Sequence, residues 1–128
     1  MGRIIVEATI ENALEPGQSI HCDALVDTGA AYLTLPSAWR ERLGSLEQLD
    51  TVEVETADQS VIEGVICGPV RLRLGRFRPV LAEVLFIDMH PADGAYEPLI
   101  GYIPLEQAQA AVDMLGHRLV KVSRVDLK

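Results

Sequence analysis

The chain has 128 residues and a mass of 14.0 kDa, with 48% apolar residues, 23% charged residues and a net charge of −8. This length suits one domain over residues 1–128, and the composition excludes disordered and collagen-like chains. The acidic excess disfavours nucleic acid as a partner, because a phosphate backbone requires a basic surface. The apolar runs are too short for a membrane span, and the N-terminal residues lack a secretory signal. We therefore expect a cytoplasmic protein with no membrane partner.

Alternating apolar and polar residues predict a hairpin at the start of the chain. Ile4, Val6, Ala8 and Ile10 share one face of a first strand, and a turn follows at residues 15–18. A second strand with the same alternation then ends at Val26, so Asp27 is predicted on the loop that follows.

The remainder of the chain predicts short antiparallel strands and two small helices. One helix is capped by Ser37 and stopped by Gly44, and the other has Pro104 in its first turn and continues through Ala108, with Ala111 as its outer limit. A long hairpin of about residues 52–66 ends at Gly68-Pro69. Further strands are predicted at residues 70–74, 80–87 and 112–122, the last range being a hairpin. About nine strands in total indicate an all-β domain closed, or nearly closed, into a barrel.

The two cysteines predict neither a metal site nor a disulfide. Cys22 and Cys67 are far apart and lack the spacing of metal ligands, so we expect two buried free thiols. We expect no cofactor.

Asp27 stands directly after an apolar strand, on a loop of small residues. Thr28 offers a hydroxyl to the carboxylate, and Gly29 lets backbone amides approach it because glycine has no side chain. The pattern predicts a carboxylate presented at the end of a strand. The alternative is an aspartate that only shapes a loop in an unrelated barrel.

Residues 24–30, Ala-Leu-Val-Asp-Thr-Gly-Ala, resemble the active-site signature of the retropepsin-like aspartic peptidases. Leu99, Ile100 and Gly101, followed by a short helix, resemble the supporting apolar-apolar-Gly motif of that family. In order and spacing, the resemblance covers nearly the whole chain. It implies the acid protease fold, an all-β closed barrel with two short helices and a flap hairpin.

The same resemblance implies an aspartic endopeptidase that acts on peptide or protein substrates, with Asp27 as the catalytic residue. Peptide hydrolysis of this type needs two carboxylates around one water, and this chain has one Asp-Thr-Gly, so the resemblance implies a homodimer. Thr28 corresponds to the residue that interlocks the two loops, and Gly29 and Ala30 complete the loop. Ala30 lacks the hydroxyl of pepsin-type enzymes, which predicts a less acidic optimum. Residues 3–6 and 119–125 are the candidate interface strands.

The hairpin of about residues 52–66 takes the position of the family's flap. Its tip residues Ala57, Asp58, Gln59 and Ser60 are candidate substrate contacts, and an ordinary polar β-turn explains them equally well. Retroviral flaps are rich in glycine, whereas this tip has none before Gly64. The alternative function is therefore a catalytically weak or inactive module of the same fold that binds peptides or dimerises.

Overall fold

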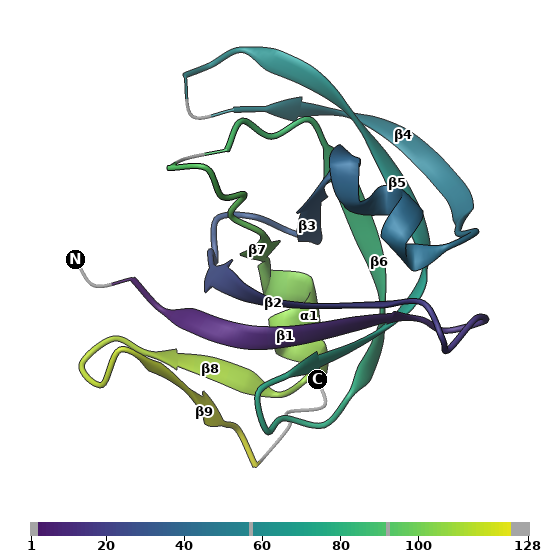
Figure 1. Ribbon diagram of the computed structural model, residues 1–128. Coiled ribbons are helices and arrows are strands. Elements are labelled where there is room, and N and C mark those ends of the chain that lie inside the picture. Colours follow the sequence, from purple (N-terminus) through teal and green to yellow (C-terminus); the bar gives the residue numbers. More distant parts are fainter. Residues whose placement is uncertain (1–2, 57, 92, 124–128) are drawn as a thin grey trace, which may run out of the picture.

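The computed structural model describes residues 3–56, 58–91 and 93–123, and these residues form nine strands and two short helices (Figure 1). In chain order the elements are β1 (Ile5–Asn12), β2 (Ser19–Val26), β3 (Leu33–Pro36), the 3-10 helix η1 (Ser37–Leu43), β4 (Glu47–Glu55), β5 (Val61–Leu74), β6 (Val80–Ile87), β7 (Leu99–Ile100), α1 (Tyr102–Gln107), β8 (Ala110–Asp113) and β9 (Arg118–Lys121).

Six of these strands close into a barrel. Their hydrogen-bonded order is β1-β2-β7-β3-β6-β5, and β5 pairs with β1 to complete the ring. The strand β4 pairs with β5 and extends the sheet as a hairpin, while β8 and β9 form a separate two-stranded sheet. The predicted closed all-β barrel is confirmed.

Two strand pairs are parallel, so the prediction of a wholly antiparallel architecture was wrong. β2 runs parallel to β7, with Leu25 opposite Leu99, and β3 runs parallel to β6, with Leu33 opposite Val84. Apolar periodicity identifies a strand but carries no information on the direction of its partner. In this arrangement β7 lies between β2 and β3, the two strands that flank the loop of Asp27.

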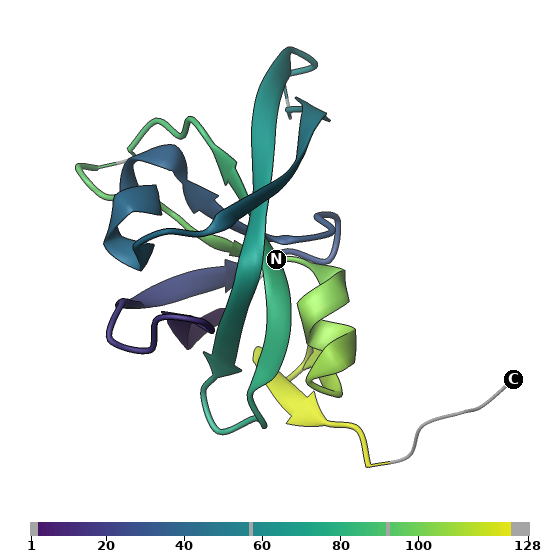
Figure 2. The same cartoon turned by 90° about the vertical axis from the view of Figure 1, so that its right-hand side faces the viewer.

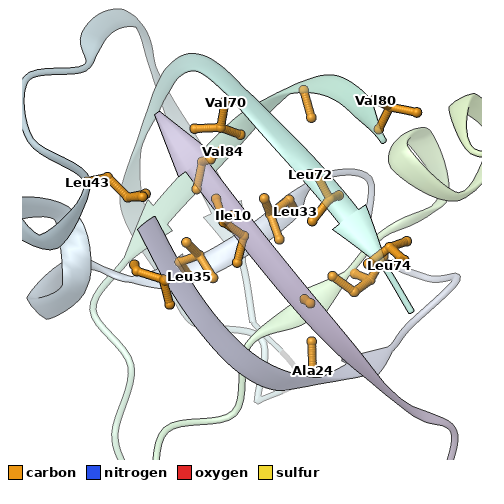
Figure 3. Packing of buried hydrophobic residues seen from close by; sticks show 14 of the residues in the cluster. Ile10, Ala24, Leu33, Leu35, Leu43, Val70, Leu72, Leu74, Val80 and Val84 are labelled. Atoms are coloured by element: carbon orange, nitrogen blue, oxygen red, sulfur yellow. The ribbon is translucent and has the colours of Figure 1, made fainter. Parts of the chain in front are cut away.

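The barrel interior is filled by side chains from alternate positions of the strands (Figure 3). Ile10, Leu33, Leu35, Leu72 and Val84 are fully buried. Each such side chain contributes roughly 1.5–3 kcal/mol to folding when it leaves water. The core therefore fixes the strands from which the Asp27 loop emerges.

One polar side chain, Asn12 at the end of β1, is fully buried. Its amide group donates hydrogen bonds to the carbonyls of Leu43 at 2.8 Å and Ser45 at 3.1 Å, and its oxygen accepts from the backbone of Leu14 and Glu15. These bonds satisfy the buried group and join the first turn to the end of η1.

Local features of the two helices differ in part from the prediction. Ser37 is the first residue of η1 and not its cap, because Pro36 holds the cap position and no side chain caps the helix. Gly44 ends the helix with φ of 70°, as predicted. Pro104 lies in the first turn of α1, also as predicted, but that helix ends at Gln107 and Ala111 belongs to β8.

The pair Gly68-Pro69 does not end a strand, contrary to the prediction. β5 continues through both residues, and its register with β6 shifts between Cys67 and Val70. A shift of this kind lets a strand pass a proline, which has no N–H to give to the sheet.

Both cysteines are free, as predicted. Cys67 is buried, whereas Cys22 is only partly buried, so the prediction of two buried thiols holds for one of them. Burial, reinforced by Asp23 and opposed by Arg42, raises the pKa of the Cys22 thiol to about 11. Among the helices of the described residues, none is long and apolar enough to cross a membrane.

Candidate active site

Asp27 lies on the loop between β2 and β3, and backbone hydrogen bonds hold this loop in place. The N–H of Asp27 donates to the carbonyl of Ile100 in β7 at 3.0 Å, and the N–H of Ala30 donates to the carbonyl of Asp27 at 3.1 Å. Just before the loop, the N–H of Val26 donates to Ile4 at 2.9 Å. The loop is therefore tied to β7, and the end of β2 before it is held by the residue that precedes β1.

The carboxylate of Asp27 is half-buried and accepts a hydrogen bond from its own loop. The N–H of Gly29 donates to Oδ1 of Asp27 at 2.9 Å. A Cβ atom at position 29 would lie 3.2 Å from that oxygen, which is a tight contact. The expected close approach of a backbone amide at Gly29 is therefore present in the structure.

Thr28 is exposed beside this carboxylate. Within the described residues, its hydroxyl has no hydrogen-bond partner, so it is available to a group outside the chain.

The segment Leu99-Ile100-Gly101 and the start of α1 support the same loop through backbone hydrogen bonds. Gly101 donates its N–H to the carbonyl of Tyr32 at 3.1 Å, and Tyr102, the first residue of α1, donates to Ala30 at 2.9 Å. Ile103 donates to Ala31 at 3.0 Å. Three successive amides of one segment thus bind three successive carbonyls of the other, which makes the loop and the start of α1 one rigid unit.

A cleft of about 700 Å³ opens over the Asp27 loop. Val52 and Val54 of β4 and Leu85 and Ile87 of β6 give it apolar walls. Its other lining residues are Asp27, Gly29, Ala30, Ala31, Tyr32, Thr34, Glu53, Glu55, Thr56 and Leu99. A cleft of this size accepts a short peptide or a small molecule, with the carboxylate of Asp27 exposed to it.

The β4–β5 hairpin covers this cleft at the position predicted for the flap, and Figure 2 shows its tip projecting beyond the barrel. At the tip, Oδ1 of Asp58 accepts hydrogen bonds from Ser60, at 3.1 Å from the N–H and 2.7 Å from the hydroxyl, and another from the hydroxyl of Thr56. These donors hold the pKa of Asp58 at about 2, below its ordinary value of 3.8, and Gln59 has a positive φ of 67°.

The predicted site residues do not all meet in the cleft. Asp27, Gly29, Ala30 and Leu99 line it, Ile100 and Gly101 support the loop through backbone hydrogen bonds, and Thr28 is exposed beside the carboxylate. Asp58, Gln59 and Ser60 are absent from the described lining, and Ala57 lies outside the described residues. The carboxylate of Asp58 is hydrogen-bonded within its own turn, which is the arrangement of an ordinary polar turn.

Sequence reasoning missed several lining residues, among them Ala31, Tyr32 and Thr34, which follow the predicted loop residues. Tyr32 presents its carbonyl to Gly101 and to the hydroxyl of Thr34, at 3.1 Å in each case. The alternation along β6 would have placed Leu85 and Ile87 together on one face, but not on the wall of a cleft.

Comparisons with known proteins agree with this geometry. A family model described as aspartyl protease matches residues 6–102, which include both the Asp27 loop and the Leu99–Gly101 segment. Among solved structures, the chain is similar to EIAV protease complexed with the inhibitor HBY-793. The TM-score is 0.61 and the identity is 18%, over 82% of this chain and 86% of that chain. No curated protein sequence matches the chain.

Proposed function

Since the chain belongs to the aspartyl protease family and has the retropepsin-like fold, we propose that it is an aspartic endopeptidase that acts as a homodimer on peptide or protein substrates. The observation that carries this proposal is the carboxylate of Asp27, half-buried on a braced loop and exposed to a cleft that the β4–β5 hairpin covers.

The homodimer follows from the number of carboxylates that the chemistry requires. Asp-Thr-Gly occurs once in the sequence, at Asp27. A two-fold axis beside the loop would bring the partner's Asp27 to the same water, because a two-fold interface presents the same surface from each protomer. The hydroxyl of Thr28 supports this arrangement, since it is exposed and bonds none of the described residues, which leaves it able to bond across the axis.

Catalysis would use the pair of Asp27 carboxylates as one acid–base unit. Two carboxylates about 3 Å apart hold one proton between them, because like charges at that distance do not both ionise. The ionised member takes a proton from the bound water, and the water oxygen attacks the peptide carbonyl. The protonated member donates a hydrogen bond to the carbonyl oxygen and then helps to protonate the leaving nitrogen. The reaction needs no covalent intermediate.

The position of β4 supports binding of an extended substrate. β4 stands at the end of the strand order, so one of its edges pairs with no strand of the described residues, and residues 52–55 of β4 line the cleft together with Thr56, which follows it. A peptide strand can pair with such an edge while its side chains enter the cleft on either side.

The hairpin tip gives a reason to test a second function, that of a peptide-binding module. The tip has no glycine before Gly64, and hydrogen bonds from Ser60 to the carboxylate of Asp58 stabilise its turn. If the tip opens poorly, the protein would bind peptides but cleave few of them. Peptide binding by the dimer that persists in Asp27→Asn, with no cleavage by the parent, would favour this alternative.

A cytoplasmic location is part of the same proposal. Two free cysteines suit a reducing compartment, where disulfides are rare.

Mixing of subunits tests the shared site directly. Parent protein is mixed with increasing fractions of Asp27→Asn at constant total concentration and allowed to exchange. If each dimer needs both carboxylates, an equal mixture retains about a quarter of the parent's activity, because only parent–parent dimers cleave. Retention of about three quarters would mean that one Asp27 per dimer suffices, and retention of one half, once mass spectrometry has shown that the subunits exchange, would mean that each Asp27 acts alone; either result would contradict the proposed dyad. Leu14→Thr, a change at an exposed residue that is not among the cleft's lining residues, serves as the control subunit.

A further inference from the structure

A second groove adjoins the cleft. It has a volume of about 450 Å³ and is largely apolar; its lining residues are Tyr32, Leu49, Pro69, Leu81, Ala82, Glu83, Ile103, Pro104 and Gln107. Three of its side chains are apolar and unusually open to solvent, since Leu49 is 44% exposed, Leu81 60% and Ile103 37%. Apolar side chains gathered along one groove mark an interaction site more strongly than scattered ones do.

The groove and the cleft are continuous along β6. Side chains of a strand alternate between its two faces, so Leu81, Glu83, Leu85 and Ile87 share one face. The first two line the groove and the last two line the cleft.

The other walls continue in the same way. On β4, Leu49 lines the groove and Val52 lines the cleft, three residues further along the strand. Tyr32, which follows the Asp27 loop, lines both spaces. Because Tyr32 borders both spaces, an extended substrate can continue from the cleft past Tyr32 into the groove.

We propose that this groove binds the substrate beyond the part held in the cleft, and that it selects a bulky apolar side chain there. This inference rests on the proposed function. An extended chain advances about 3.3 Å per residue, so the three residues from Val52 to Leu49 span about 10 Å. The selected side chain thus lies about three residues beyond the substrate segment in the cleft.

The charge of the groove also restricts which substrate side chain it binds. Glu83 is the one residue charged at neutral pH among its described lining residues, and no cation accompanies it. An acidic substrate residue at this position would meet Glu83 without a partner, whereas leucine would cover Leu81 and Ile103 and leave Glu83 in water at the rim. The groove therefore favours leucine over both serine and aspartate.

A positional peptide library tests the inference. Each position in turn carries leucine, serine or aspartate, and cleavage is read by mass spectrometry. We expect the parent to favour leucine over serine by about 5- to 10-fold at one position outside the cleft segment. Leu81→Thr, and independently Leu49→Thr, should reduce that preference to below about 2-fold. Leu14→Thr is the matched control, because Leu14 is 76% exposed and is not among the groove's lining residues; it should keep the parent's preference.

A second readout separates this inference from the proposed function. The same library is passed over immobilised Asp27→Asn protein, with and without Leu81→Thr, and the retained peptides are identified. If the parent cleaves nothing, the proposed function fails, but enrichment of leucine that depends on Leu81 still supports the groove. The absence of a positional preference in both readouts, or a preference that Leu81→Thr and Leu49→Thr leave unchanged, would overturn the inference.

Discussion

Gly101 lies so close to Ala31 that a Cβ atom added to the glycine would be 2.5 Å from the carbonyl carbon of Ala31. The same atom would lie 2.6 Å from the oxygen of Ala30 and 2.6 Å from the nitrogen of Tyr32. All three neighbours are backbone atoms, so none can rotate away. The end of β7 and the loop that carries Asp27 are thus packed backbone against backbone.

Gly101→Ala should therefore destabilise the protein and disturb the Asp27 loop. We expect the free energy of unfolding to fall by about 2–3 kcal/mol, since the added methyl group must push two backbone segments apart. Urea denaturation measures this loss. Gly17→Ala is the control, because a Cβ atom at Gly17 meets nothing within 4 Å. Equal effects of the two substitutions would contradict the described packing.

Gln59 holds a left-handed backbone conformation at the hairpin tip, with φ of 67°. Glycine adopts this region without the penalty that a side chain brings, so Gln59→Gly should raise the free energy of unfolding by about 0.5–1 kcal/mol. Gln48→Gly, the same change inside β4, should lower it by a similar amount because glycine weakens a strand. Thermal or urea unfolding of both variants checks the prediction, which fails if the two changes have the same sign.

The carboxyl group of Asp58 should titrate near pH 2. Hydrogen bonds from Thr56 and Ser60 favour its ionised form and lower its pKa from 3.8 to about 2. Because the folded pKa lies below the unfolded value, the contribution of this group to stability is complete above about pH 4 and is lost as the pH falls through about 2. NMR titration of the side-chain carboxyl measures the midpoint. In Ser60→Ala the midpoint should rise, whereas a parent midpoint near 4 would show that the turn is open.

Ala30→Ser should extend activity toward lower pH. A hydroxyl at position 30, on the same loop as Asp27, can donate a hydrogen bond to the ionised carboxylate of Asp27 and stabilise it. We expect the acidic limb of the kcat/KM profile to move down by about half to one pH unit. Ala31→Ser, at the neighbouring lining residue, is the control and should leave the limb in place. A limb that stays fixed or moves upward in Ala30→Ser would contradict the prediction.

The features that sequence reasoning predicted are those with a short-range signal. The alternation around Ile10 predicted β1, Gly44 predicted the end of η1, and the resemblance around Asp27 predicted the barrel that the structure contains. Each depends on the residue itself or on its near neighbours in the chain.

The features that it missed depend on partners far away in the sequence. The parallel pairing of Leu25 with Leu99 places β7 between β2 and β3, and no local pattern encodes this contact between distant parts of the chain. No local pattern singles out Asn12, yet its buried amide binds carbonyls more than thirty residues away. The groove beside Tyr32 is likewise assembled from β4, β6 and α1, so it becomes visible only in the folded chain.

Digestion of a peptide library by the parent and by Asp27→Asn, across roughly pH 4–8 and at a concentration that favours the dimer, tests the central claim most directly. We predict cleavage by the parent, with a defined sequence preference, and none by Asp27→Asn. Cleavage that survives in the folded, dimeric variant would contradict the assignment of Asp27. A folded, dimeric parent that cleaves nothing would contradict the peptidase and favour the peptide-binding module.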